Sequence, residues 1–153
     1  NDKVLAMNKK EATVEQAREA VLMAKKAGLK VWGYFMLGMF GDNKQTMEET
    51  VRLSKQLPFD IVNFAVSAPY PGTEWGEIAD SNGWLIDKRW EAYDQNYSAQ
   101  VSQPGCDIQL VKETQRNAYK QWYFSWRGLK FLINCFKPEY ISYFIKTALN
   151  HIK

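Results

Sequence analysis

Two short apolar segments that bracket one helical segment limit the possible folds of this chain more than any other feature. The first covers residues 30–37 and is rich in aromatic and β-branched residues, and the second covers 60–67. Between them, apolar residues recur at helical spacing at Val51, Leu53 and Leu57. This order predicts a right-handed crossover between two parallel strands. Because 30–37 is apolar on both faces, we expect a buried strand and not an edge strand.

Each predicted strand ends in a loop marked by glycine or proline. Residues 38–43 contain two glycines followed by Asp42 and Asn43, and Pro69 and Pro71 flank Tyr70 in the second loop. Ligands of such units sit at the carboxyl ends of the strands, where both loops lie. A glycine loop before a helix can bind an anion or let the backbone approach a flat ligand, but glycines there more often serve the turn itself. The two prolines fix the Tyr70 ring in one place, which suits either a binding surface or a stiff turn.

Helices are predicted at residues 1–9, 14–27, 45–56 and 106–124. Thr13 with Gln16, and Thr46 with Glu49, have the form of capping boxes. In the second helix we expect a stripe of small residues to pack closely on the sheet: Ala17, Ala20, Val21, Ala24 and Ala27. In the fourth helix, the candidates for the buried side are Ile108, Val111, Ala118 and Trp122.

Composition favours a folded domain without a metal site. The 153 residues are 46% hydrophobic and 14% aromatic, which is ample for a packed core. A net charge of +3 with dispersed lysines gives no indication of nucleic acid binding. Cys106 and Cys135 have no neighbouring third ligand, so we expect inert core cysteines, and His151 near the chain end is expected to be solvated. Without a signal peptide or a spanning apolar run, a cytoplasmic location is predicted.

The chain opens without methionine, directly in a helical pattern, and its first predicted strand comes only at residue 30. We therefore expect a piece of a longer protein whose further strands lie upstream.

Taken in order, the motifs resemble the later half of a radical S-adenosylmethionine (SAM) enzyme domain, most closely the subgroup with an amino-terminal cobalamin-binding domain. In that family the fifth strand of a partial barrel ends in a Gly-x-Pro-Gly-Glu-Thr type of loop, and the sixth ends in Pro-Tyr-Pro-Gly-Thr. Residues 33–42 resemble the first motif, with Phe40 in place of proline and Asp42 in place of glutamate, and residues 69–73 match the second in full. The likeness covers residues 1–83.

The resemblance implies an α/β fold, namely a fragment of a partial (β/α) barrel with parallel strands, followed at residues 84–153 by an aromatic-rich helical extension. It implies SAM and a four-iron four-sulfur cluster as cofactors and leaves cobalamin open. The cluster thiolates would come from an upstream Cys-x-x-x-Cys-x-x-Cys loop, so this chain alone is expected to be inactive. The implied cofactor-binding residues form part of the SAM adenine pocket: Met36, Gly38, Gly41, Asp42, Ser67, Ala68 and Tyr70. The first four would pack against adenine, and the last three would offer backbone polar groups to its edge and an aromatic wall to an unknown small-molecule substrate.

Two functions stay open at this point. The chain is either the carboxyl-terminal barrel portion of such an enzyme, with the missing amino-terminal part as its partner, or a non-catalytic α/β module that binds a protein through its basic aromatic helices. Residues 129–153 suit packing on the rest of the protein, cover of a partner, or contact with a membrane surface, and packing is favoured. Exposed strand edges would also allow two copies to pair.

Overall fold

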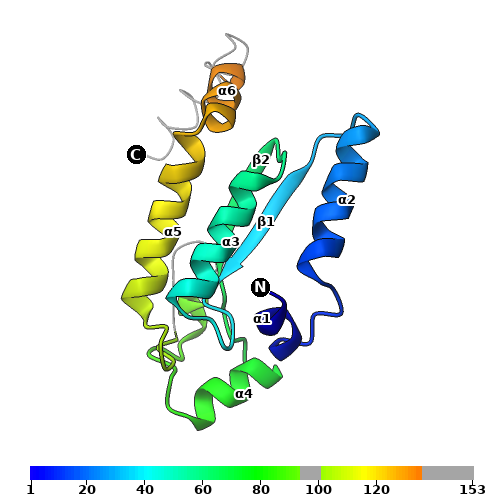
Figure 1. Ribbon diagram of the computed structural model, residues 1–153. Helices are drawn as coiled ribbons and strands as arrows, with labels where there is room; N and C mark the ends of the chain where they lie inside the picture. The colour runs from blue at the N-terminus through cyan, green and yellow to red at the C-terminus, as the bar shows by residue number, and fades with distance from the viewer. Residues whose placement is uncertain (94–100, 136–153) are drawn as a thin grey trace, which may run out of the picture.

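The computed structural model describes residues 1–93 and 101–135 of the chain. Two helices come first, the two strands follow with one helix between them, and the remaining elements are all helical (Figure 1). Their bounds are α1 (Asp2–Met7), α2 (Val14–Lys26), β1 (Trp32–Leu37), α3 (Lys44–Gln56), β2 (Ile61–Val66), α4 (Glu74–Ser81), the 3-10 helix η1 (Trp90–Ala92), α5 (Ile108–Tyr123) and α6 (Trp126–Cys135).

The strands β1 and β2 are parallel neighbours joined through α3. Their register runs from Trp32 opposite Ile61 to Leu37 opposite Val66. The predicted α/β unit with parallel strands is therefore confirmed, and both strands lie within the predicted segments. Helix α3 begins one residue before the predicted start and ends at the predicted residue.

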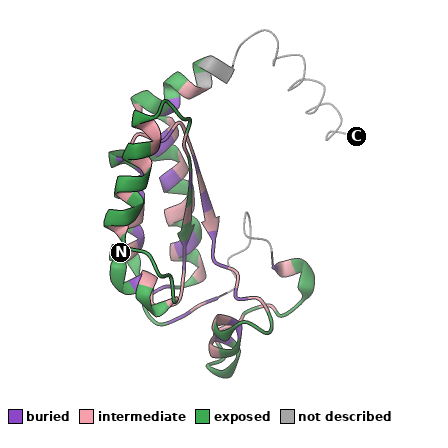
Figure 2. Ribbon diagram, turned by 90° about the vertical axis from the view of Figure 1, so that its right-hand side faces the viewer, coloured by how far each residue is buried: buried purple, intermediate pink, exposed green. Residues whose placement is uncertain are grey.

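One face of the sheet forms the core against α3 and α5. Alternate residues of the strands point into this layer, because successive side chains of a strand face opposite sides. Figure 2 shows the strands edge-on with described helices gathered along one side. The buried apolar residues of the layer come from both strands and both helices: Leu37, Val62, Phe64, Val66, Met47, Val51, Val111, Ala118 and Trp122.

The opposite face of β1 is open in the described part of the chain. Trp32 is 58% exposed and Tyr34 is 67% exposed. Within the described residues β1 pairs with β2 alone, so it lies at an edge of the sheet. The expectation of a strand buried on both faces is wrong for these residues, because the described helices cover only one of the two faces.

Helix α2 also differs from expectation. Its capping box between Thr13 and Gln16 is confirmed, but none of its residues is buried, and Ala17, Ala20 and Ala27 are exposed. An ion pair of 2.8 Å joins Lys25 Nζ of the helix to Asp60 Oδ2, just before β2. Of the predicted stripe, Val21 packs partly buried against the core, and the exposed alanines do not pack on the sheet.

The start of α3 uses a different capping box from the predicted one. Asn43 is the N-cap, its side chain accepts from the N–H of Thr46, and the Thr46 hydroxyl accepts from the N–H of Asn43. Glu49 instead accepts a hydrogen bond of 2.6 Å from Asn1 Nδ2. The prediction of Thr46 and Glu49 as the box is wrong because the helix begins earlier, which places Thr46 inside its first turn.

Helix α5 agrees with the prediction for residues 106–124. Asp107 caps it, Val111, Ala118 and Trp122 are buried as expected, and Ile108 packs partly buried against the core. Cys106 is buried, which confirms a core position for this cysteine. The side chain of Cys135, His151 and most of the segment 129–153 lie outside the described residues.

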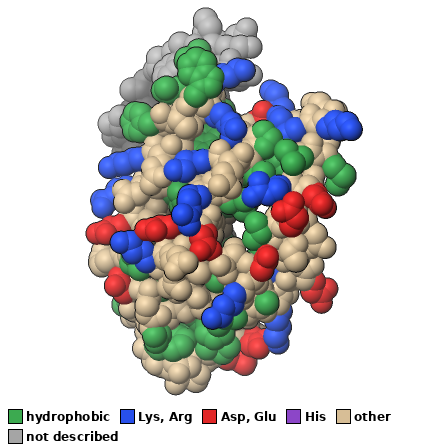
Figure 3. Space-filling model, viewed as in Figure 1, with side chains coloured by type: hydrophobic (Ala, Val, Ile, Leu, Met, Phe, Trp, Pro, Cys, Tyr) green, Lys and Arg blue, Asp and Glu red, His purple; other side chains and the backbone are tan. Residues whose placement is uncertain are grey.

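The surface in Figure 3 shows basic and acidic side chains interspersed over the same face, in line with the small net charge. No helix in the described ranges combines the length and the apolar character that crossing a membrane requires.

Candidate functional site

The two motif loops leave the sheet side by side. Leu37 and Val66 are register partners, and the N–H of Ser67 donates a hydrogen bond of 2.8 Å to the carbonyl of Leu37. We call the two loops, 38–43 and 67–73, the strand-end rim; it lies at the end of the sheet that faces α1 and α4 (Figure 1). This placement is the one expected for a ligand site in a parallel α/β unit.

Asp42 is an internal brace of the first rim loop. Its side chain is buried and accepts hydrogen bonds from the Met39 N–H (3.0 Å) and the Thr46 hydroxyl (2.5 Å). Burial raises the pKa of the Asp42 carboxyl above its ordinary value, although the hydrogen bonds from Thr46 and the loop backbone oppose the rise. Although one methylene shorter than the glutamate of the resembled motif, this carboxyl reaches the loop backbone.

Gln103 holds the same loop from far along the chain. Its amide donates to the Met39 carbonyl (2.8 Å) and accepts from the Gly41 N–H (3.1 Å), and the residue is only 7% exposed. No role for Gln103 was predicted from the sequence. A single glutamine in a polar stretch follows no periodic pattern, so no sequence signal would have identified it.

The rim glycines are accounted for by backbone conformation and packing. Gly38 and Gly41 have φ angles of +74° and +81°, which favour glycine. A Cβ at Gly38 would lie 3.1 Å from Val111, and one at Gly41 would lie 2.6 Å from the Met7 methyl group. Side chains of this chain thus fill the space beside both glycines. The contact of Gly38 and Gly41 with adenine stays a prediction.

Tyr70 in the second rim loop is held by aromatic neighbours. Its ring stacks on Tyr93 with centroids 5.6 Å apart, Trp90 lies 6.3 Å away, and its hydroxyl donates to the Tyr93 carbonyl (3.3 Å). The helix α4 starts directly against this loop, since a Cβ at Gly76 would lie 2.3 Å from the Tyr70 carbonyl oxygen. The ring is therefore fixed in place, next to the exposed Trp90.

A second aromatic group lies under the first rim loop. The Phe40 ring is 5.1 Å from Trp75 and 6.5 Å from Trp84. Asn8 in turn donates to the Phe40 carbonyl (2.8 Å), which joins α1 to the rim. The segment after residue 83 thus supplies Trp84 to one rim loop and Tyr93 to the other.

Of the remaining predicted site residues, Met36 is exposed and Ala68 is half-buried, whereas Ser67 is buried. Met36 is 37% exposed on the open face of the sheet, where Ala65 is its register partner. Among the described residues no hydrogen bond reaches the N–H of Ala68. An apolar side chain beside a backbone donor fits the face and edge of a flat ring such as adenine.

The described residues form no metal centre. The ranges 1–93 and 101–135 contain no group of three His, Cys, Asp or Glu side chains placed to hold a metal ion. Cys106 is a buried thiol, and burial together with the nearby Asp42 raises its pKa to about 12. It is therefore protonated at neutral pH and is a poor ligand or nucleophile.

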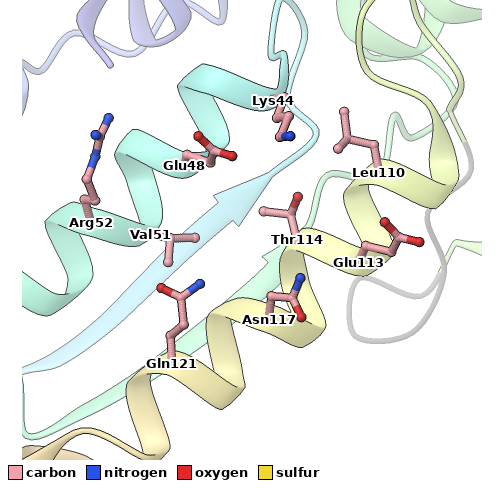
Figure 4. A pocket seen from close by; sticks show the side chains of 9 residues that line it. All are labelled: Lys44, Glu48, Val51, Arg52, Leu110, Glu113, Thr114, Asn117 and Gln121. Atoms are coloured by element: carbon pink, nitrogen blue, oxygen red, sulfur yellow. The ribbon is translucent and has the colours of Figure 1, made fainter.

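A groove of about 390 Å³ lies elsewhere, between the outer sides of α3 and α5 (Figure 4). Charged side chains of both signs line it, with Lys44, Glu48 and Arg52 on α3 and Glu113 on α5. It lies on the helix layer and not at the strand-end rim.

The fold and the rim define an α/β unit whose loops meet at the carboxyl ends of parallel strands. No family model matches the chain. It is 34% identical over 91 residues to a protein of Pyrococcus horikoshii named as an uncharacterized methyltransferase, an alignment that covers 60% of this chain and 20% of that protein. It is also 31% identical over 77 residues, 50% of this chain and 14% of the relative, to an anaerobic magnesium-protoporphyrin IX monomethyl ester cyclase of Rubrivivax gelatinosus.

An enzyme of the same name from Cereibacter sphaeroides is 25% identical over 144 residues, which span 84% of this chain and 22% of the relative. The chain thus spans less than a quarter of the length of these curated relatives. It is similar to one part of proteins named for methyl transfer and for ring closure.

Proposed function

We propose that this chain forms the later part of the partial barrel of a radical SAM enzyme, and that its strand-end rim binds the adenine of SAM. The observation that carries the proposal is the hydrogen bond between Ser67 and Leu37, which sets the two motif loops side by side. The similarity to a methyltransferase and to cyclases supports the same class.

The residues of the rim divide into contact and support. Met36 and the backbone at Gly38 would lie against the adenine ring, and the backbone of Ala68 would bond to its edge. Asp42 and Gln103 keep the first loop in shape through the backbone of Met39 and Gly41.

Tyr70, held by Tyr93, would form the wall toward a small organic substrate.

The proposed location of the protein is the cytoplasm.

The cofactors supply the reactive chemistry, and this chain supplies their surroundings. A four-iron four-sulfur cluster held elsewhere would supply the electron for SAM cleavage, and cobalamin would supply methyl-transfer chemistry. The described residues offer no ligand set for the cluster, so its thiolates would belong to another part of a longer polypeptide. The 153-residue chain by itself is therefore proposed to be inactive.

The proposal is tested with the longer protein that contains this chain, reconstituted anaerobically. Met36→Glu should weaken SAM binding, measured by calorimetry, by about tenfold or more, since it places a charge against the adenine. Tyr34→Glu is the matched control, because Tyr34 lies on the same open face two residues farther from the rim. Equal losses in both variants would contradict the assignment, and so would the lack of a Cys-x-x-x-Cys-x-x-Cys segment upstream in the coding sequence.

Protein binding through the carboxyl-terminal helices is a second candidate, favoured by one observation. Phe124 and Trp126, at the junction of α5 and α6, are 79% and 81% exposed. Large exposed aromatic side chains of this kind are typical of contact surfaces. A Phe124→Ser and Trp126→Ser double variant should then lose binding to the partner protein, measured by ultracentrifugation of the mixture, while retaining its own fold.

A further inference from the structure

Side chains of α5 occupy the outer edge of β2. The hydroxyl of Tyr119 accepts a hydrogen bond of 3.1 Å from the N–H of Phe64, and Gln115 Nε2 donates one of 2.7 Å to the Phe64 carbonyl. Tyr119 also donates to Asn63 Oδ1. Both backbone groups of the central residue of β2 are thereby bonded to side chains, in the way a neighbouring strand would bond to them.

This edge is the one that faces away from β1. Residues of a parallel strand bond alternately to the two sides, and Ser67 bonds to Leu37 of β1. Phe64 lies three positions before Ser67, so its N–H and carbonyl point to the side of β2 that faces away from β1. Tyr119 and Gln115 consequently stand where a further strand would pair with β2.

Packing sets the position of the Tyr119 ring independently of its hydroxyl. The ring meets Phe64 edge-on with centroids 5.3 Å apart and stacks against Tyr123 at 6.1 Å. Ala118 and Trp122, next to these residues on α5, are fully buried. The helix therefore presents the hydroxyl to the strand from a fixed place.

The sequence of β2 explains why its edge needs cover. Residues 61–66 read Ile-Val-Asn-Phe-Ala-Val, without the lysine or proline that commonly protects an edge strand from pairing with another chain. Among the described residues, no side chain bonds to the backbone of Trp32, Tyr34 or Met36 in β1. The two edges of the sheet thus differ, and α5 covers the β2 edge.

We propose that Tyr119 and Gln115 close the outer edge of β2 against pairing with a strand of a second copy of this chain. The closure is independent of SAM binding, because it uses residues on the edge opposite β1 and away from the rim. The Tyr119 hydroxyl lies 3.3 Å from the Phe64 carbonyl as well, as a second donor to it. Loss of both the Tyr119 hydroxyl and the Gln115 amide would therefore release the N–H and the carbonyl of Phe64 for such pairing.

The test uses the variants Tyr119→Phe and Gln115→Ala, singly and together, in the 153-residue chain. Amide hydrogen exchange measured by NMR should become about tenfold faster at Phe64 in Tyr119→Phe, the effect of losing one hydrogen bond of about 1.4 kcal/mol. In sedimentation experiments, the double variant should form dimers at concentrations at which the original chain forms none. Tyr34→Phe and Gln109→Ala are matched controls, because each alters an exposed side chain of the same type. Neither control should change the exchange at Phe64 or cause dimers to form.

Unchanged exchange at Phe64 in Tyr119→Phe would overturn the proposal. Dimers of the double variant that pair through β1, identified by exchange protection at Tyr34, would also overturn it. Should the double variant lose its native circular dichroism, the exchange at Phe64 in the folded Tyr119→Phe variant decides the question, since that variant keeps the packed ring.

Discussion

The side-chain amide of Gln103 donates a hydrogen bond of 2.8 Å to the carbonyl of Met39, 64 residues earlier in the chain. The same amide accepts from Gly41, so one buried side chain satisfies two backbone groups of the first rim loop. The segment after residue 100 is in this way bound to the loop that the sequence motif places at the end of β1.

Replacement of Gln103 by leucine should destabilise the chain by about 1–3 kcal/mol. The variant leaves the half-buried Gly41 N–H without a partner and removes one of the two hydrogen bonds that the Met39 carbonyl accepts, since the bond from the Asp42 N–H remains. A group left without a partner costs about 1–3 kcal/mol. Urea unfolding followed by circular dichroism measures the change in the free energy of unfolding. Gln109→Leu on the exposed side of α5 is the control. An equal loss of stability in this control would show that the hydrogen bonds of Gln103 to the rim loop do not account for the effect.

Asp42 should give the stability of the chain a distinct pH dependence. Its pKa is raised in the folded state, mainly by burial, above the ordinary value of 3.8. The native state therefore holds this proton more tightly than the unfolded state does, and the resulting stabilisation is present below pH 3.8 and lost as the pH rises through the folded-state pKa. As the pH rises through this pKa, the free energy of unfolding of the original chain should fall relative to that of Asp42→Asn.

The measurement is urea unfolding of both chains at a series of pH values. Glu48→Gln, which neutralises an exposed carboxylate at the start of α3, is the control and should show no such difference. A constant difference between Asp42→Asn and the original chain at every pH would contradict the raised pKa.

The parallel strands and α3 were predictable because their patterns are local. A run of apolar residues, a helical spacing and a glycine or proline at each end are all visible within short windows of sequence. The same holds for the cap at Thr13 and for the buried positions of α5. The cap of α3 was misplaced by one turn, because Asn43 and Thr46 both suit the N-cap and only the loop geometry selects between them.

The support of the rim was not predictable, because it consists of single polar residues that act over long sequence distances. Gln103 meets Met39, and Tyr119 meets Phe64, through side chains with no periodic signature. The open face of β1 was also missed, since an apolar strand looks the same whether its second face is covered by this chain or left exposed. The adenine contacts of the rim rest on motif likeness and stay predictions.

Cys106 should react slowly with thiol reagents while the chain is folded. Burial raises its pKa to about 12, so the reactive thiolate is scarce at neutral pH, and the side chain is only 1% exposed. Iodoacetamide labelling followed by mass spectrometry of the Cys106 peptide should show rapid modification only after urea is added. Equally fast labelling in the folded chain would contradict a closed core at this position.

Arg127 should secure the junction of α5 and α6 to the end of α3. Its guanidinium donates hydrogen bonds to the carbonyls of Lys55 (2.8 Å) and Leu57 (2.7 Å), groups at a helix end that lack a partner within the helix. Arg127→Ala should therefore lower the free energy of unfolding by about 1–2 kcal/mol, measured by urea unfolding. Lys130→Ala removes an equal charge one turn away on the exposed side of α6, and should change stability by less than about 0.5 kcal/mol. If both variants lost the same stability, the effect would come from charge and not from the two carbonyl bonds, because only Arg127 makes them.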